Sequence, residues 1–429
     1  MKMLTVPNKT LVEMCRVATN KEGDSFVGIK AEVIDDKQEV TVNFPLGYEL
    51  PSDSESARKE IIALVSVLQA HNDENSRLKS VNVNQALKTL NFPMEAYTFV
   101  IHDFLNRGSY YKETEEYYIQ TLGGRINWQR TLKRVQPVVQ PSGFKFLKME
   151  SKRQSDTEIT LLTEINKYCV YEACLNMGWL YNLPLPERSR INYNRSQFES
   201  IINQKIATTF NDLERRLFQS MLDILNYKDR QEEPDRFYFG TNNFQYIWEN
   251  LIDYTYGIPN KKDYFPRTQW NLVFETNISQ GYALEPDTIM LHNNNVFVLD
   301  AKYYKFGESN MIKDLPPSTS INKQITYGEY IANQEKFKSI HGIDSKVYNA
   351  FLLPFSKGHE IFKSDGMYQY IGEALGDWKG HDKAYERVQG ILVDVKTLIK
   401  NTTKKRTQYI QELSDLISEK VDKQLENIQ

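Results

Sequence analysis

Four charged side chains that could hydrolyse a phosphodiester bond lie close together in this sequence: Glu285, Asp287, Asp300 and Lys302. Two carboxylates about 5 Å apart at Cβ suit Mg²⁺ or Mn²⁺, because these ions prefer oxygen ligands and retain several waters. A lysine beside them can polarise the attacking water or hold a phosphate oxygen. The residue types therefore predict metal-dependent hydrolysis, with Asp287 and Asp300 as metal ligands, Mg²⁺ as the cofactor and Mn²⁺ as a substitute.

A β-hairpin would position these side chains. Leu284–Leu291 and Val296–Tyr303 are strand-like runs, and His292–Asn295 between them has the composition of a turn whose asparagines tolerate positive φ. We expect Leu291 to pair with Val296 across this turn. Side chains alternate between the two faces of a strand, so the register decides which charged groups meet.

This register gathers the charged groups on one face of the hairpin. Asp287 would lie directly opposite Asp300, and Glu285 opposite Lys302. Like charges that face each other weaken a sheet, so folding alone gives no reason for the Asp287–Asp300 pair, whereas a shared divalent ion does. The alternative is a surface hairpin that carries an ordinary ion pair.

The same residues resemble the motif of the PD-(D/E)XK nuclease superfamily. Pro286-Asp287 is followed, after a gap of twelve residues, by Asp300-Ala301-Lys302 at the end of an apolar strand. The resemblance implies an α/β core whose mixed central sheet is flanked by helices. It also implies a Mg²⁺-dependent endonuclease that acts on double-stranded DNA, in which the Ala301 carbonyl helps to hold the metal and Lys302 orients or activates water.

A predicted helix at Ser320–Gln334 carries a further candidate. Its apolar stripe consists of Ile321, Ile325, Gly328 and Ile331. Gln324 falls inside this stripe, where a buried amide needs a hydrogen-bonding partner. Many nucleases of the superfamily carry a glutamine or lysine on this helix, so the resemblance implies that Gln324 holds water or phosphate. The alternative is that backbone groups satisfy it, and the flanking Tyr327 and Lys323 could touch the phosphate backbone.

Another candidate lies upstream, on a predicted helix that begins at Thr241 or Asn242. The apolar face of this helix consists of Phe244, Ile247, Trp248 and Leu251. The superfamily often supplies a catalytic glutamate from the helix before the hairpin, and the resemblance makes Glu249 its match. Glu249 lies away from the centre of the apolar face, so a solvated glutamate is the alternative.

Several segments resemble one restriction family within the superfamily, the LlaJI-type restriction endonuclease subunit. They are Phe44-Pro45-Leu46-Gly47-Tyr48, residues 124–131, Phe239-Gly240-Thr241-Asn242, the hairpin and residues 321–328. That family is similar to the McrC nuclease subunits, so the resemblance implies a partner: a McrB-like AAA+ GTPase motor that recognises DNA and activates cleavage. The chain departs from McrC-like nucleases at Gly328, where they tend to place a tyrosine four residues after the glutamine.

Composition agrees with an intracellular enzyme. The chain has 429 residues, 40% of them hydrophobic, and a formal net charge of -3. The three cysteines have no disulfide or zinc spacing, and there is neither a signal-peptide core nor an apolar stretch of membrane-spanning length, so we expect a cytoplasmic protein without membrane contact. Phosphate contacts dominate DNA affinity, so the negative balance suggests that a partner brings the chain to DNA. No Walker A motif is present, so a nucleotide would be bound by another chain.

Three regions are predicted along the chain. Residues 1–155 are expected to form an α+β domain for partner or DNA contact, beginning with a hairpin of the strands Phe26–Val33 and Glu39–Phe44. Residues 156–236 have the pattern of long helices that form a connecting region. Residues 237–429 hold the nuclease elements, in an order typical of an α/β domain.

Residues 123–153 are rich in basic and aromatic side chains. Eight Lys or Arg residues stand against one Glu there, interleaved with Trp128, Phe144 and Phe146. Basic residues mixed with aromatics can track a nucleic-acid backbone. DNA contact is therefore predicted for Arg125, Arg130, Lys133 and Arg134, and for Lys323 on the later helix. A solvated face or a contact with another subunit is the alternative, because charge runs are usually solvated.

The residues and the resemblance together favour the DNA endonuclease subunit of a bacterial restriction-modification system, activated by a motor subunit. One alternative is a stand-alone type II endonuclease, or a repair or transposition nuclease, of the same superfamily. Another, from a different class, is a non-catalytic DNA-binding assembly protein. The complete set of Asp287, Asp300 and Lys302 argues against that last alternative.

Overall fold

The computed structural model describes most of the chain, namely residues 9–34, 37–78, 92–141, 143–156, 160–230, 236–273, 279–362, 364–401 and 405–427. These residues group into two compact units. The first unit combines residues 1–91 with residues 236–429, and the second unit comprises residues 92–235.

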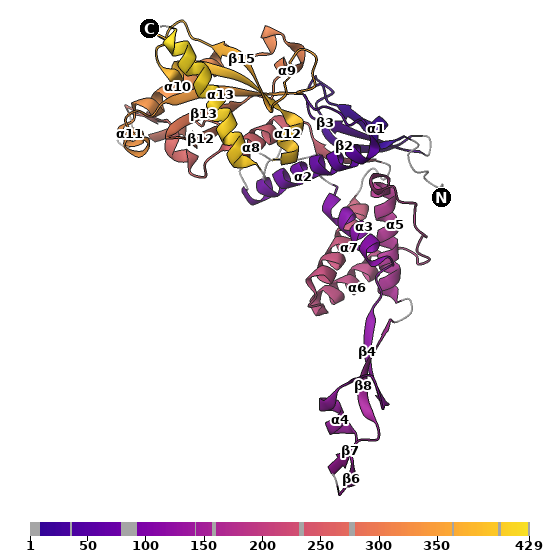
Figure 1. Cartoon of the computed structure of the whole chain (residues 1–429). Helices are drawn as coiled ribbons and strands as arrows, with labels where there is room; N and C mark the ends of the chain where they lie inside the picture. The colour runs from indigo at the N-terminus through magenta and orange to yellow at the C-terminus, as the bar shows by residue number, and fades with distance from the viewer. Residues whose placement is uncertain are drawn as a thin grey trace. The chain divides into compact units, whose positions relative to one another are not determined.

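The first unit is built around a five-stranded mixed sheet (Figure 1). Its strands, in spatial order, are β12 (Thr288–His292), β13 (Asn295–Ala301), β14 (Val347–Phe355), β16 (Val388–Asp394) and β15 (Tyr368–Ala374). The inner pairs β13–β14 and β14–β16 are parallel, and the outer strands β12 and β15 run antiparallel to their neighbours. All residues of β14 are buried, as expected for the central strand of a sheet that is covered on both faces.

Helices cover the two faces of this sheet. On one face, α10 (Ser318–Asn333) packs its apolar stripe against Val298 and Phe351. Two more helices, α8 (Phe244–Tyr256) and α13 (Arg406–Glu426), also pack against the sheet. The Tyr348 hydroxyl of β14 donates a hydrogen bond to Asp422 of α13. The expectation of a mixed α/β fold is confirmed. Alternation along β13 directs Asp300 to the same face as Val298, toward α10.

The hairpin β12–β13 has the register that the sequence predicts. Leu291 pairs with Val296, and Asn293 and Asn294 form the connection with φ angles of 48° and 63°. Two positive φ angles in a two-residue connection are typical of a type I′ turn, whose twist matches that of the strands. The turn and register are therefore fixed by the two asparagines.

Both strands of the hairpin are shorter than expected. Pairing ends at Thr288 with Leu299, so the ladder stops one step before Asp287. The chain before this point pairs elsewhere, since the Leu284 amide donates to the Pro266 carbonyl at 2.8 Å. The predicted opposition of Glu285 and Lys302 within a ladder is wrong for this reason.

A second sheet of the first unit brings distant segments together. Its strands, in spatial order, are β1 (Cys15–Val17), β3 (Lys37–Phe44), β2 (Val27–Ile34) and β9 (Arg236–Thr241). The predicted hairpin near the N-terminus is confirmed as β2–β3. Strand β2 also pairs with β9, where Gly28 faces Gly240, and a Cβ on either glycine would collide with the backbone of the opposite strand.

The pairing of β2 with β9 explains why the observed units differ from the expected regions. It ties the N-terminal strands to residues 236–429, so residues 1–91 belong to the unit that contains the hairpin. The expected boundary near residue 155 falls inside the second unit. The expected boundary near residue 236 coincides with an observed one.

The first unit contains one further long helix, α2 (Ser54–Leu78), and several short elements. The short elements are α1 (Leu11–Met14), η1 (Lys261–Tyr264), the two-stranded ribbon of β10 (Arg267–Trp270) and β11 (Ser279–Ala283), α9 (Phe306–Ser309), η2 (Ile312–Asp314), α11 (Glu335–His341), η3 (Ala384–Glu386) and α12 (Val395–Asn401). Within the described ranges of both units, no helix is long and apolar enough to span a membrane.

The second unit has a helical part and a ribbon part. The helices are α3 (Met94–Arg107), α5 (Leu161–Tyr181), α6 (Arg195–Thr208) and α7 (Asp212–Arg230). The ribbon part, residues 114–156, contains β4 (Thr114–Thr121), β5 (Arg125–Ile126), α4 (Trp128–Arg134), β6 (Val138–Gln140), β7 (Gly143–Lys145) and β8 (Met149–Asp156). Since α3 packs against α5 and α7, it belongs with the helices that were expected to form a separate connecting region.

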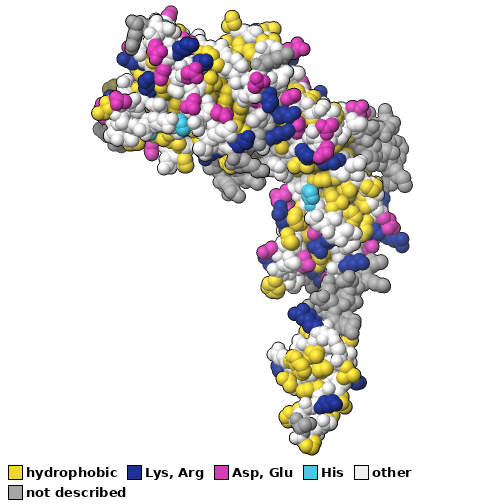
Figure 2. All heavy atoms as spheres, viewed as in Figure 1, with side chains coloured by type: hydrophobic (Ala, Val, Ile, Leu, Met, Phe, Trp, Pro, Cys, Tyr) yellow, Lys and Arg dark blue, Asp and Glu magenta, His cyan; other side chains and the backbone are white. Residues whose placement is uncertain are grey.

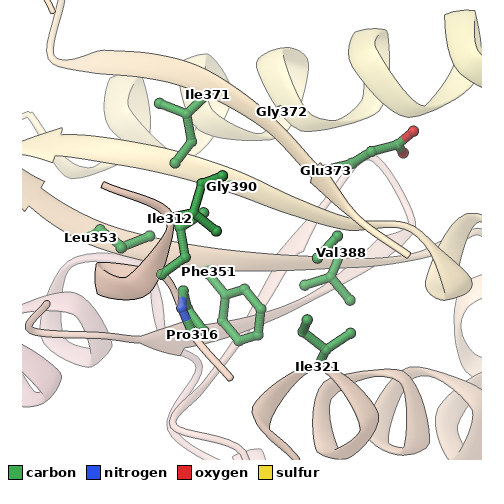
Figure 3. A pocket seen from close by; sticks show the side chains of 12 residues that line it. Ile312, Pro316, Ile321, Phe351, Leu353, Ile371, Gly372, Glu373, Val388 and Gly390 are labelled. Atoms are coloured by element: carbon green, nitrogen blue, oxygen red, sulfur yellow. The ribbon is translucent and has the colours of Figure 1, made fainter. Parts of the chain in front are cut away.

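An apolar cavity of about 290 Å³ lies on the α10 side of the five-stranded sheet. Figure 3 shows Phe351, Ile321 and Ile371 bordering it, while the carboxylate of Glu373 points away from them. Glu373 is engaged by Arg387, whose guanidinium lies 3.0 Å away. The cavity contains none of the predicted site residues and lacks the charged groups that hydrolysis requires.

Candidate active site

Asp287 and Asp300 come together at the end of the β12–β13 hairpin. Asp300 lies on β13 and is only 8% exposed. Asp287 lies one residue before β12, and its Oδ2 accepts a hydrogen bond from the Ala301 amide at 2.9 Å. This carboxylate thus satisfies a β13 amide beyond the end of the ladder, which holds it beside Asp300 although the two residues are not paired as strand neighbours.

The two carboxyls interact strongly. Burial, the charge of Asp300 and hydrogen bonding to it, and the charge of Glu249 raise the pKa of Asp287 to about 8, while Lys302 acts in the opposite direction. Asp287 is therefore protonated at neutral pH when no cation is bound. A divalent ion between the carboxyls would favour the ionised form, so the pair has the electrostatics of a metal site.

Lys302 completes the centre from the end of the hairpin. Its Nζ lies 2.8 Å from Oδ2 of Asp300, and its side chain is mostly buried. Burial lowers the pKa of Lys302, but Asp300, through charge and a hydrogen bond, and Asp287 outweigh that effect and leave the pKa above its usual value. The ammonium therefore stays charged, which suits a hydrogen-bond donor and electrostatic stabiliser rather than a base.

The structure brings Glu249 close to the hairpin centre. The residue is half-buried on α8. Burial raises the pKa of Glu249, Lys302 and Lys261 oppose that rise, and Asp300 adds to it. These influences require proximity, so Glu249 faces the hairpin charges rather than standing alone in solvent.

Gln324 is fully buried on α10, in the position that the apolar stripe predicts. Its Nε2 donates to the Val298 carbonyl at 2.6 Å. A backbone group therefore satisfies the amide nitrogen, which agrees with the predicted alternative to a catalytic role. Its Oε1 has no hydrogen-bond partner among the described residues. Gln324 thus fixes α10 to β13 two residues before Asp300, and only its oxygen remains to hold a water.

Tyr327 and Lys323 lie on the same helix as Gln324. The Tyr327 hydroxyl donates to the Glu285 carbonyl at 3.3 Å, which steadies the segment that leads to Asp287. Lys323 is exposed, with its Nζ 5.9 Å from the centre of the Tyr327 ring.

Close packing explains why residue 328, which follows Tyr327, is a glycine. A Cβ on Gly328 would lie 2.6 Å from Nδ2 of Asn349, a buried β14 residue. The departure from McrC-like nucleases at this position therefore reflects how closely α10 approaches the sheet.

Lys261 also holds Asp287 in place, and the sequence analysis did not predict this contact. Its Nζ donates to the Asp287 carbonyl at 2.6 Å and lies 2.7 Å from Oδ2 of Asp253. The other Asp253 oxygen accepts a hydrogen bond from the Thr288 hydroxyl at 3.0 Å. One signal could have shown this network: Asp253 follows Glu249 by four residues and shares its helix face. Lys261, in the short η1 helix, offers no such periodicity.

Most of the predicted DNA-contacting residues belong to the ribbon part of the second unit. Arg125, Lys133 and Arg134 are exposed there. Arg130 is engaged within the fold, because its guanidinium lies 3.9 Å from the centre of the Tyr118 ring and its Nε lies 3.8 Å from Glu150.

The ribbon part also exposes many apolar side chains, which gather on its surface in Figure 2. They are Leu122, Trp128, Leu132, Val138, Val139, Phe144 and Leu147. An apolar surface interleaved with basic residues agrees with the predicted alternatives of nucleic-acid or subunit contact better than with a solvated face.

The donor set fits a metal that keeps most of its waters. In the residues that the structure describes, no three or more His, Cys, Asp or Glu side chains are arranged as a ready metal cluster. Mg²⁺ is usually held by one or two carboxylates and completed by water and substrate phosphate. Asp287 and Asp300 match that requirement, and the pKa of Asp287 is raised first by burial and then by the charge of Asp300, which a bound cation would offset.

The mixed α/β fold carries an acidic centre at one edge of its five-stranded sheet. The sequence model of the LlaJI restriction endonuclease family matches residues 26–371, so the chain belongs to the LlaJI restriction endonuclease family. Membership in a restriction endonuclease family implies nuclease activity. The matched region contains every residue of the hairpin centre.

One solved structure similar to this chain is the refined half-complex from a tetradecameric assembly of Thermococcus gammatolerans McrB AAA+ hexamers with bound McrC. The sequences are 15% identical, the likeness covers 91% of this chain and 83% of that one, and the TM-score is 0.38. No curated protein matches the chain. The family assignment rests on the sequence match.

Proposed function

We propose that this chain is the nuclease subunit of a bacterial restriction-modification system and hydrolyses DNA phosphodiester bonds with Mg²⁺. The observation that carries the proposal is that the buried side chains of Asp287 and Asp300 lie next to each other and beside Lys302. The endonuclease family of the chain supports the same chemistry. The PD-(D/E)XK assignment of the five-stranded sheet belongs to this proposal, because the motif residues stand on its β12 and β13 edge.

Each residue has a separate task in the proposed reaction. Asp287 and Asp300 hold the metal, which when bound polarises the phosphate and lowers the pKa of a water. Lys302 donates a hydrogen bond to the attacking water or to a phosphate oxygen. Glu249 accepts a proton or orients the water, a task that its raised pKa suits. Gln324 keeps β13 in place.

We further propose that an AAA+ GTPase motor works with this chain and directs it to DNA. The resemblance to McrC-like subunits supports such a partner, and so does a formal net charge of -3, which is unusual for a protein that grips DNA unaided. The exposed Arg125, Lys133 and Arg134 are proposed as DNA contacts of the second unit. Lys323 is proposed as a phosphate contact near the hairpin.

Plasmid cleavage by the purified chain tests the proposal. We expect cleavage with Mg²⁺ or Mn²⁺ when the proposed AAA+ GTPase motor subunit and GTP are present, and none in EDTA. Asp300→Ala should abolish it. Asp344→Ala is the matched control, because Asp344 is exposed just before β14, at the end of the sheet opposite to Asp300.

The outcomes separate the alternatives. Cleavage by the chain alone, without motor or GTP, would favour a stand-alone type II, repair or transposition nuclease. Full cleavage by Asp300→Ala would reject the proposed centre. DNA binding and assembly without cleavage under any of these conditions would favour a non-catalytic assembly protein.

A further inference from the structure

The ribbon β10–β11 is exposed to an unusual degree. All four side chains of β10, from Arg267 to Trp270, are exposed, and Trp270 is 67% accessible. In the described part of the first unit these two strands pair only with each other. A two-stranded ribbon is at best marginally stable in water, and an exposed tryptophan adds no stability by burial. Its exposure therefore calls for a binding role.

The base of the ribbon is attached to the hairpin centre. Arg267 pairs with Ala283, and the next hydrogen bond joins the Leu284 amide to the Pro266 carbonyl at 2.8 Å. Ala283 precedes Asp287 by four residues, so the chain separates them by about 14 Å at most. That distance is about four base-pair steps of 3.4 Å along a DNA strand. A duplex whose scissile phosphate lies at Asp287 is therefore within reach of the base of the ribbon.

The side chains of β10 are those that bind DNA. Arg267 can pair with a phosphate or with guanine, Gln269 can pair with adenine, and the Trp270 ring can stack or pack against sugars. Neither strand contains a carboxylate, so nothing on β10 or β11 repels a polyanion. This contrasts with the negative balance of the whole chain.

The ribbon consists of two strands only and carries no side chain at Gly281. A Cβ there would collide with the Thr268 hydroxyl of the facing strand. The major groove of B-DNA admits a two-stranded β-ribbon. The exposed ribbon β6–β7 belongs to the second unit and has no such covalent tie to the hairpin.

We propose that β10–β11 is a DNA-contacting ribbon that lies along the duplex beside the scissile phosphate. This inference rests on the proposed nuclease function and deepens it. The ribbon supplies local affinity beside the carboxyl groups of the hairpin centre, which do not themselves attract a phosphate until a metal is bound.

Cleavage kinetics give the first test, in whichever mixture cleaves plasmid. The variants are Arg267→Ala, Gln269→Ala and Trp270→Ala, singly and combined. The matched controls are Trp378→Ala, an exposed tryptophan that follows β15 at the opposite edge of the sheet, and Lys423→Ala, an exposed cation on α13. We expect the triple variant to raise KM for DNA about tenfold or more and Arg267→Ala to reduce the salt dependence of binding, while the controls match wild type.

Crosslinking gives the second test and identifies the occupant. Gln269→Cys, labelled with a photoreactive benzophenone, should form adducts with DNA in the cleaving mixture when Ca²⁺ replaces Mg²⁺. Labelled Trp378→Cys should not, and wild type controls for labelling of Cys15. A wild-type KM in the triple variant, or adducts from Gln269→Cys with protein alone, would overturn the ribbon proposal while leaving the nuclease intact. If no mixture cleaves, the nuclease proposal fails first, and the ribbon proposal fails with it.

Discussion

Two hairpins that follow each other along this chain have opposite surroundings. The hairpin β12–β13 lies at one edge of the five-stranded sheet, and β13 is buried from Val296 to Ala301. The ribbon β10–β11 exposes every side chain of its first strand. Burial beside Asp300 raises the pKa of Asp287 in the first case, whereas exposure leaves arginine and glutamine free to reach a ligand in the second. In the proposed roles, the same secondary structure serves chemistry in one place and contact in the other.

The largest expected effect comes from removing a charge of the buried hairpin. Asp287→Ala, Asp300→Ala and Lys302→Ala should each reduce cleavage on the order of 10³-fold or more, because the three act as one unit. Single-turnover cleavage under saturating DNA measures this effect. Ribbon variants should instead act mainly through KM. Equal losses of kcat in variants of both hairpins would show that the two hairpins do not differ in role.

A smaller loss is expected at Lys261, which touches the backbone of Asp287 and not the reacting atoms. Lys261→Ala should raise the Mg²⁺ concentration needed for half-maximal cleavage about 10–100-fold, the range found for residues that orient metal ligands. Lys261→Arg should recover part of this loss, since the ion pair with Asp253 can re-form.

The neighbouring Lys262→Ala is the control for Lys261, because Lys262 is exposed. Mn²⁺ binding to the unreacted protein, followed by titration calorimetry, gives a readout that does not depend on turnover. Wild-type metal affinity in Lys261→Ala would show that this lysine only stabilises the fold.

The pH dependence of stability provides a third comparison, made without metal. Asp287 has a pKa of about 8 in the fold, against a usual value of 3.8. Between these limits the folded protein binds more protons than the unfolded chain, so this group makes stability fall as pH rises. In EDTA, the melting temperature of wild type should drop relative to that of Asp287→Asn between about pH 4 and about pH 8.

Added metal should reverse that drop. Mg²⁺ or Mn²⁺ should raise the melting temperature of wild type by mass action and should do so much less in Asp287→Asn or Asp300→Asn. Arg267→Ala, in the exposed ribbon, should respond to pH and metal as wild type does. A metal-induced shift equal in all variants would show that Asp287 and Asp300 do not share an ion.

The smallest effect is expected at Gln324. Gln324→Leu should leave the buried Val298 carbonyl without its donor and lower the free energy of unfolding by about 1 kcal/mol, because loss of the unpartnered Oε1 offsets part of the cost. Cleavage should fall less than tenfold. A loss as large as that of Asp300→Ala would assign the glutamine to water or phosphate.

The hairpin could be predicted from sequence because its determinants are local. Two asparagines that accept positive φ set the turn, and alternation along the strands sets the register. Strand β14, Val347–Phe355, is mostly apolar, as is usual for a buried central strand. The mixed sheet itself follows from strands separated by helices.

Other parts of the site could not be predicted, because they depend on contacts between distant segments. Asp287 is held by Lys261, whose position comes from the fold and not from any repeat in the sequence. The apolar stripe correctly placed Gln324 in the core, but only the structure shows that Val298 is its partner. The helical wheel leaves both the catalytic and the solvated alternative open for Glu249, because a wheel shows the face of a helix but not the charges that another element places opposite it.

The pairing of β2 with β9 has a consequence for how a cell makes this protein. Strand β2 leaves the ribosome early, yet its neighbour spans residues 236–241, so its edge stays open while the whole second unit is synthesised. Open strand edges invite aggregation, and this sheet is complete only after translation has passed residue 241. The hairpin with Asp287 and Asp300 emerges later still. A product truncated between residues 241 and 287 therefore carries the second unit and the strands of this sheet without Asp287, Asp300 or Lys302.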